Sequence, residues 1–131
     1  MKKTLLLNAA LARVIAGLGH GDMLVIADAG LPIPPGVECI DLALCKNIPG
    51  FFDTLRVVLS EMQVEQAVTA EETSRVSPMI EAAIAELLPD TPLRHMPHEQ
   101  FKQLSASARA IVRTGQFTPY ANVILVAGTV F

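Results

Sequence analysis

The feature that most constrains the fold is a short, unbroken apolar run at residues 23–27, Met-Leu-Val-Ile-Ala, with polar residues at both ends. Such a run without alternation is typical of a strand that is buried on both faces of a sheet. Asp28 follows the run at once, and the glycine and prolines within residues 30–35 prevent the ladder from continuing. In open α/β sheets, ligands bind at the carboxyl ends of strands. The sequence therefore predicts a buried strand that ends at a candidate ligand-binding carboxylate.

Hydrophobic periodicity predicts that helices and strands alternate along the chain. Helices are expected after Asn8 and Ser77, each placed as an N-cap, and after Pro49-Gly50 and Pro97. Further strands are expected at residues 37–44, 66–70, 93–96, 109–113 and 122–127. The connection between the last two strands is too short for a parallel crossover. We therefore predict an α/β fold: a single domain over residues 1–131, with a mixed, mostly parallel β-sheet and helices on both faces.

Composition restricts the partners of the chain. Of its 131 residues, 51% are hydrophobic and only 18% are charged, whereas an average soluble domain has about 25% charged residues. We therefore expect self-association to hide part of the surface. The formal net charge of −3 and the lack of a basic cluster argue against nucleic acid, and every apolar run is too short for a membrane span. The expected ligand is small and neutral.

The start of the chain imitates a signal peptide, because two lysines precede an apolar stretch and small residues. Asn8 interrupts that stretch too early, so a cytoplasmic location is predicted. Cys39 and Cys45 have no neighbouring cysteine or histidine pair, which favours neither a zinc site nor a disulfide. We interpret both as unpaired thiols.

The known motifs of cofactor chemistry are misplaced or absent. Three glycines at residues 17–21 precede the apolar run, whereas the phosphate loop of dinucleotide-binding proteins follows its strand. His95 and His98 are separated by Pro97, which argues against one helix that presents both to a metal. The chain has no Gly-x-Ser-x-Gly motif and no nucleotide-binding loop. Neither a metal site nor covalent catalysis is expected.

A set of polar residues in the expected loops remains as the candidate site. It comprises His20, Asp28, His98 with Lys102 on one helix face, and the turn at residues 118–122, which contains the only tyrosine, Tyr120. Each has a structural alternative, since the histidines can be ordinary surface residues, Asp28 can cap a turn and Asn122 can satisfy loop backbone. Together they favour a site for a polar, uncharged ligand.

Seven separated motifs, in one order along the chain, resemble the ribose pyranase and fucose mutarotase family. They are LGH at 18–20, Asp22, DAGLP at 28–32, ID at 40–41, EMQVE at 61–65, HEQFK at 98–102 and TPYAN at 118–122. The resemblance runs from Lys2 to Phe131. One departure from the family pattern is Gly21, where threonine is common.

The resemblance implies a cofactor-free enzyme that interconverts the β-pyranose and β-furanose forms of ribose, assembled as a pentamer or as a decamer of two rings. It places His20 at the general-acid position. The sugar-binding positions that it implies are Asp28, His98, Tyr120, Ala121 and Asn122, and we add Lys102 because it shares the His98 face. Two other classes stay open: a mutarotase that exchanges the anomers of another sugar such as fucose, and a non-catalytic monosaccharide-binding module.

The spacing of His20 and Asp28 predicts a site shared between subunits. If residues 23–27 are extended at about 3.3 Å per residue, the strand holds the two backbones roughly 20 Å apart. One pentose cannot bridge that gap. Either the loop at residues 19–21 folds back along the sheet, or the sugar meets groups of a neighbouring chain. The apolar composition favours the neighbour, with the His98/Lys102 face or the Tyr120 turn supplied across the interface.

Overall fold

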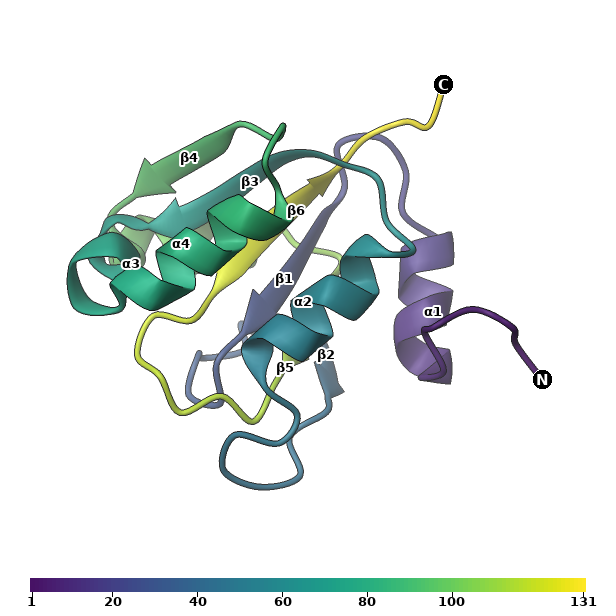
Figure 1. Cartoon of the computed structure of the whole chain (residues 1–131), viewed down its shortest axis with the longest axis horizontal. Coiled ribbons are helices and arrows are strands. Elements are labelled where there is room, and N and C mark those ends of the chain that lie inside the picture. Colours follow the sequence, from purple (N-terminus) through teal and green to yellow (C-terminus); the bar gives the residue numbers. More distant parts are fainter.

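The computed structural model describes residues 1–131 and contains one six-stranded sheet (Figure 1), with core side chains of helices packed on both of its faces. The strands are β1 (Met23–Ala27), β2 (Glu38–Asp41), β3 (Val64–Ala70), β4 (Leu93–Met96), β5 (Ala110–Arg113) and β6 (Val123–Ala127). The helices are α1 (Ala9–Ala16), α2 (Phe51–Leu59), α3 (Glu71–Val76), α4 (Pro78–Leu87) and α5 (His98–Ser105). The predicted α/β class is confirmed.

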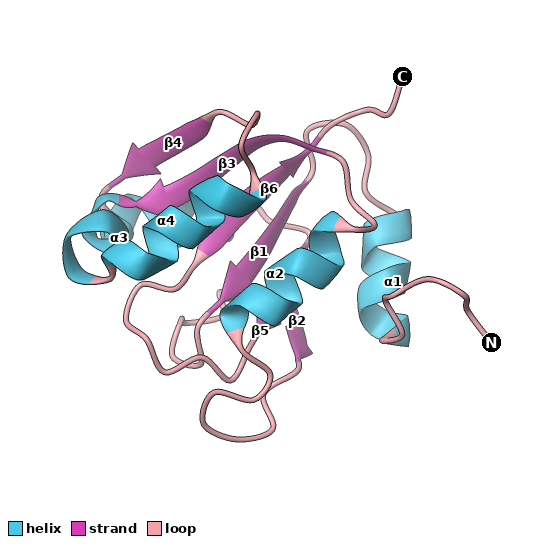
Figure 2. Ribbon diagram, viewed as in Figure 1, coloured by secondary structure: helices cyan, strands magenta, loops and turns pink.

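The sheet has the strand order β2-β5-β1-β6-β3-β4, so β1 lies in its interior (Figure 2). β1 pairs in parallel with β5 and antiparallel with β6, and β6 also pairs antiparallel with β3. The edge strands β2 and β4 run parallel to β5 and β3. Only β6 opposes the other strands, which confirms the mixed, mostly parallel sheet. Because β5 and β6 run in opposite directions on either side of β1, a short connection can join them.

β1 is buried on both faces, as its apolar run predicts. Leu24 and Ile26 belong to the larger core, which α1, α2 and α4 cover, and α2 and α4 are seen in front of the sheet in Figure 1. Val25 and Ala27 belong to the smaller core, where Phe101 of α5 packs. A fully buried leucine, isoleucine or valine contributes about 1.5–3 kcal/mol relative to an exposed one. The two cores therefore fix β1 and the residues at its ends.

Two helix caps predicted from the sequence have different outcomes. Asn8 caps α1, because its Oδ1 accepts a hydrogen bond from the N–H of Leu11 at 2.9 Å. Ser77 stands directly before α4, but its side chain makes no capping bond. Its hydroxyl instead donates to the carbonyl of Pro119 at 2.6 Å. The position was right and the capping role was wrong. The other two predicted helix starts are confirmed.

Two further elements differ from the prediction. Helix α3 was not predicted, because it follows β3 without a break, has six residues and buries only Thr73. The second strand is shorter than residues 37–44, since β2 ends at Asp41. The Oδ1 of Asp41 accepts a hydrogen bond from the N–H of Ala43 at 3.0 Å, and this bond turns the chain away from the sheet. The remaining strands begin and end within two residues of the predicted ranges.

Cys39 and Cys45 are free, exposed thiols. None of the five helices has both the length and the apolar character that a bilayer crossing requires.

Candidate active site

A polar pair, Asp28 and Asn122, lies at the carboxyl end of β1. Asn122 is buried directly before β6, which runs antiparallel beside β1. Its Oδ1 accepts a hydrogen bond from the N–H of Asp28 at 2.8 Å, and its Nδ2 donates to Asp28 Oδ2 at 2.9 Å. The other carboxylate oxygen of Asp28 accepts from the N–H of Gly30 at 2.9 Å. A carboxylate at the end of a buried strand is costly without partners, and these bonds supply them and fix its orientation.

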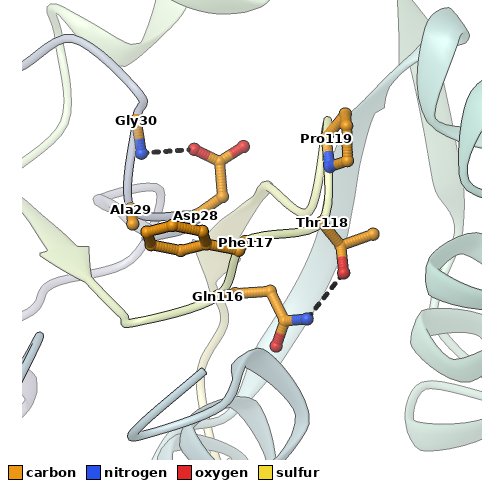
Figure 3. Close-up of a pocket in the computed structure, with 7 residues that line it drawn as sticks. All are labelled: Asp28, Ala29, Gly30, Gln116, Phe117, Thr118 and Pro119. Atoms are coloured by element: carbon orange, nitrogen blue, oxygen red, sulfur yellow. Dashed lines mark hydrogen bonds between the residues drawn. The ribbon is translucent and has the colours of Figure 1, made fainter. Parts of the chain in front are cut away.

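A hollow of about 310 Å³ opens beside this pair and is lined by residues 28–30 and 116–119 (Figure 3). The Asp28 carboxylate and the Thr118 hydroxyl provide polar groups, whereas the exposed ring of Phe117 and the ring of Pro119 provide apolar surface. Sites for small molecules combine apolar walls with a few fixed polar groups in this way.

His98 and Tyr120 lie against each other beside this end of the sheet, with ring centroids 5.0 Å apart and ring planes at 82°. His98 begins α5, and its ring also stacks on Phe101. Its Nδ1 is buried without a hydrogen-bond partner. Tyr120 has a φ of 59°, which is uncommon for a residue other than glycine. Ala121, predicted as a sugar-binding residue, is fully buried within the larger core and exposes no atom at this surface.

His20 lies at the opposite end of β1. Its Nε2 is 2.8 Å from the Oε2 of Glu65, next to the start of β3, and its side chain is 63% exposed. The neighbouring Gly21 donates a backbone hydrogen bond to Ala127 at 2.8 Å, so the loop stays at the amino end of β1 and does not fold back along the sheet. Gly21 has a φ of 84°, which glycine adopts without strain. The residue that departs from the family pattern therefore suits its turn.

Lys102 is engaged on its own helix. Its Nζ is 2.7 Å from the carboxylate of Glu99, and its side chain is one-third exposed. The hydrogen bond and charge of Lys102 lower the pKa of Glu99.

Of the predicted site residues, the structure brings Asp28, Asn122, His98 and Tyr120 to one end of the sheet. It leaves His20 at the other.

Sequence reasoning missed two carboxylates that contact the candidate residues. Glu65, which belongs to the EMQVE motif, pairs with His20, and the motif was the one available signal. Both oxygens of Glu72 accept from the backbone N–H of His98, at 3.1 and 3.2 Å, and nothing in the local sequence marks this contact.

The two histidines that were weighed as a metal pair have different partners. His95 contacts Glu81 of α4, whereas His98 contacts Tyr120. No group of three or more histidine, cysteine, aspartate or glutamate side chains is arranged to hold a metal ion.

Comparison with known proteins places this geometry among relatives. The model of the RbsD / FucU transport protein family matches residues 1–130. The D-ribose pyranase of Chloroflexus aggregans is 62% identical over 131 residues, which cover 100% of both chains. The structure of Bacillus subtilis RbsD complexed with D-ribose is 46% identical, covers 100% of both chains and has a TM-score of 0.97. The fucose mutarotase of Streptococcus pneumoniae, complexed with L-fucose, is 26% identical over 100% of both chains, with a TM-score of 0.85.

Proposed function

The chain belongs to the RbsD / FucU transport protein family, and from this premise we propose that it is a sugar isomerase that interconverts the β-pyranose and β-furanose forms of D-ribose. The observation that carries the proposal is the 62% sequence identity to the D-ribose pyranase of Chloroflexus aggregans, over the full length of both chains. The ribose-bound Bacillus subtilis relative supports ribose as the substrate. The fucose mutarotase is more distant in sequence, so ribose is preferred to fucose.

The groups at the carboxyl end of β1 suit a sugar. The Asp28 carboxylate, held by Asn122, can accept hydrogen bonds from sugar hydroxyls. The His98 and Tyr120 rings offer aromatic surface for the C–H face of the sugar, with a phenol hydroxyl at one edge. The hollow of about 310 Å³ lies at the lower end of the range of small-molecule sites, about 300–1,000 Å³. It is therefore of a size for a ligand as small as a pentose.

The reaction needs only proton transfers. Opening the pyranose breaks the bond between C1 and O5, delivers a proton to O5 and removes the proton of the anomeric O1 hydroxyl, which leaves the open-chain aldehyde. Closing the furanose forms the bond between C1 and O4, while O4 loses its proton and O1 gains one. Atoms and protons balance with no change in oxidation state. General acid–base catalysis of such steps contributes roughly 10²- to 10⁴-fold in rate.

We assign the delivery of the proton to His20. Imidazole is the side chain whose charge changes near neutral pH, so it can give a proton and regain it. The carboxylate of Glu65 accepts a hydrogen bond from His20 Nε2, which orients the ring and leaves Nδ1 for the sugar. The ring is exposed and thus accessible to a ligand from outside the chain.

The separation of the two half-sites supports a site built from two copies of the chain. His20 and Asp28 flank opposite ends of β1, about 20 Å apart for an extended strand. His20 of one copy therefore meets the Asp28 end of another. Exposed apolar side chains, including Leu44, Met79 and Phe117, support self-association. We propose a pentamer or a decamer of two rings. A monomer in light scattering at micromolar concentration would contradict this assembly.

We also propose that the enzyme works in the cytoplasm. Its two free, exposed cysteines suit a compartment that keeps thiols reduced. Recovery of the native protein in a periplasmic fraction of the producing cells would contradict this location.

Magnetisation-transfer NMR of ribose and fucose, with and without the protein, tests the proposed reaction. We expect faster exchange between the pyranose and furanose signals of ribose. If only the fucose anomers exchange faster, the enzyme is a fucose-type mutarotase. If neither sugar responds while both still bind, the protein is a non-catalytic monosaccharide-binding module.

A further inference from the structure

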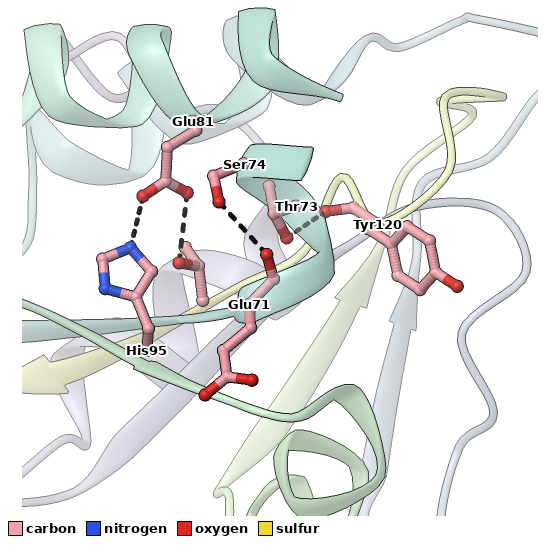
Figure 4. A network of polar contacts seen from close by, with 7 residues as sticks. Glu71, Thr73, Ser74, Glu81, His95 and Tyr120 are labelled. Atoms are coloured by element: carbon pink, nitrogen blue, oxygen red, sulfur yellow. Dashed lines mark hydrogen bonds and ion pairs between the residues drawn. The ribbon is translucent and has the colours of Figure 1, made fainter. Parts of the chain in front are cut away.

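The α3 helix and the residue that follows it contact both aromatic residues of the candidate sugar site. The hydroxyl of Thr73 donates to the carbonyl of Tyr120 at 3.0 Å, and Figure 4 shows it directed at that carbonyl. The hydroxyl of Ser77 donates to the preceding carbonyl, that of Pro119, at 2.6 Å. The Glu72 carboxylate accepts from the backbone N–H of His98. Residues 72–77 therefore hold both the Tyr120 turn and the start of α5, each of which is remote from them in sequence.

The turn at Tyr120 needs such support. A tyrosine with a φ of 59° is in the left-handed region, which is unfavourable for residues with a Cβ and persists where the surroundings fix it. Thr73 and Ser77 are 0% and 6% exposed, so water cannot take over their bonds to the turn. The two hydroxyls fix consecutive carbonyls, and this sets the direction in which the Tyr120 side chain leaves the backbone.

Glu72 supplies the N-terminal capping interaction that the residue directly before α5 does not provide. The residue before α5 is Pro97, which makes no side-chain capping bond. Instead, the Glu72 carboxylate accepts from the backbone N–H of His98, the first residue of α5. Its two oxygens lie 3.1 and 3.2 Å from that nitrogen. A negative charge at this position also interacts favourably with the helix dipole. It fixes the backbone of His98, whose ring packs against Tyr120.

We infer that Glu72, Thr73 and Ser77 are positioning residues, which set the mutual placement of His98 and Tyr120 and thereby the affinity for the sugar. The inference rests on the proposed function. Thr73 and Ser77 are buried and bonded to the backbone of residues 119–120, so they act through the Tyr120 turn and do not touch the sugar. Their loss should weaken ribose binding more than it slows turnover, because His20 is positioned by Glu65 and none of the bonds of Glu72, Thr73 or Ser77 involves that pair.

The test compares Thr73→Val, which keeps the shape and removes the donor, with Thr73→Ser, which keeps the donor. Ribose exchange is measured by magnetisation-transfer NMR over a range of ribose concentrations, so that KM and kcat are separated. We expect Thr73→Val and Ser77→Ala each to raise KM at least about threefold and to change kcat less than about twofold. Thr73→Ser should restore KM. Ser74→Ala is the matched control, because its hydroxyl bonds only to Glu71 within α3.

Glu72 provides an independent arm. Glu72→Ala should raise KM, whereas Glu72→Gln should retain most of the affinity because an amide oxygen still accepts from His98. Circular dichroism and light scattering confirm folding and assembly of each variant, and Glu72→Ala replaces Thr73→Val if the latter does not fold. Unchanged KM in folded variants, with an active wild type, overturns the inference alone. An inactive wild type overturns the proposed function and this inference with it.

Discussion

Replacing Asn122 tests how firmly the Asp28 carboxylate is held. Asn122→Ala removes two hydrogen bonds to Asp28, one to its N–H and one to its carboxylate. A bond between neutral groups contributes about 0.5–1.5 kcal/mol and a bond to a charged group about 1.5–3 kcal/mol. Asn122 is 1% exposed, so water does not replace it freely. The expected loss is therefore about 2–4.5 kcal/mol in the free energy of unfolding, or roughly 6–20 °C in Tm for a chain of this size.

Asn122→Asp separates the two bonds. It keeps the acceptor for the N–H of Asp28 but replaces the donor by an oxygen that faces Asp28 Oδ2 at 2.9 Å. Two carboxylates this close cannot both be ionised, so the folded pair keeps a proton that the unfolded chain has already lost above about pH 4. Because the folded state binds more protons, its stability falls as the pH rises. The loss of Tm relative to wild type should be larger at pH 8 than at pH 5.

Thermal unfolding followed by circular dichroism at both pH values measures these effects, with Gln103→Ala as a control at an exposed position of α5 that makes no side-chain hydrogen bond. Ribose exchange on the same samples should show a raised KM for both Asn122 variants. A Tm of Asn122→Ala close to that of the control, or an equal loss of Tm at the two pH values for Asn122→Asp, would refute the reasoning.

Three further predictions concern single residues. His20→Ala should lower ribose turnover at least about tenfold without lowering Tm, because the ring is exposed and its one hydrogen-bond partner is Glu65. A near-normal exchange rate would transfer the acid role to His98. Gly115→Ala should lower the free energy of unfolding by about 1–3 kcal/mol in urea titration, because a Cβ there would overlap the backbone carbonyl oxygen of Ile48. Unchanged stability would disprove this close approach. The pKa of the Cys39 thiol is raised, chiefly by burial, so iodoacetamide should label Cys39 more slowly at pH 8 than it labels a cysteine in a short peptide. Equal labelling rates, measured by mass spectrometry, would contradict this prediction.

The sequence predicts elements whose signals are local. The apolar run of β1 and the Asn8 cap of α1 are decided by neighbouring residues, and both are confirmed. Helix α3 escapes prediction because its six residues have no apolar stripe and follow β3 directly. Ser77 misleads because its hydroxyl, placed as a cap, bonds instead to Pro119, 42 residues away. Local sequence patterns do not show that a distant carbonyl competes with the helix end for the same hydroxyl.

In the candidate site too, local features are predictable from the sequence and long-range contacts are not. The polar residues at the end of β1 are predictable, because a strand end in an α/β sheet is a known place for ligands. The contacts that support them are not, since Glu72 bonds to His98 across 26 residues and Thr73 to Tyr120 across 47. The separation of His20 from Asp28 did follow from the length of the strand alone. The structure adds that the His20 loop stays at its own end of the sheet.

The central structural claim, that each site combines His20 of one copy with the Tyr120 end of another, is tested most directly by mixing two variants, each of which is expected to be strongly impaired on its own. His20→Ala and Tyr120→Ala proteins are dissociated, combined in equal amounts and reassembled, and ribose exchange is measured by magnetisation transfer. Random assembly of a ring with head-to-tail interfaces gives two intact halves at about one interface in four. We therefore expect about a quarter of wild-type activity per site. No recovery, in rings that mass spectrometry shows to be mixed, would mean that both residues serve a site within one chain.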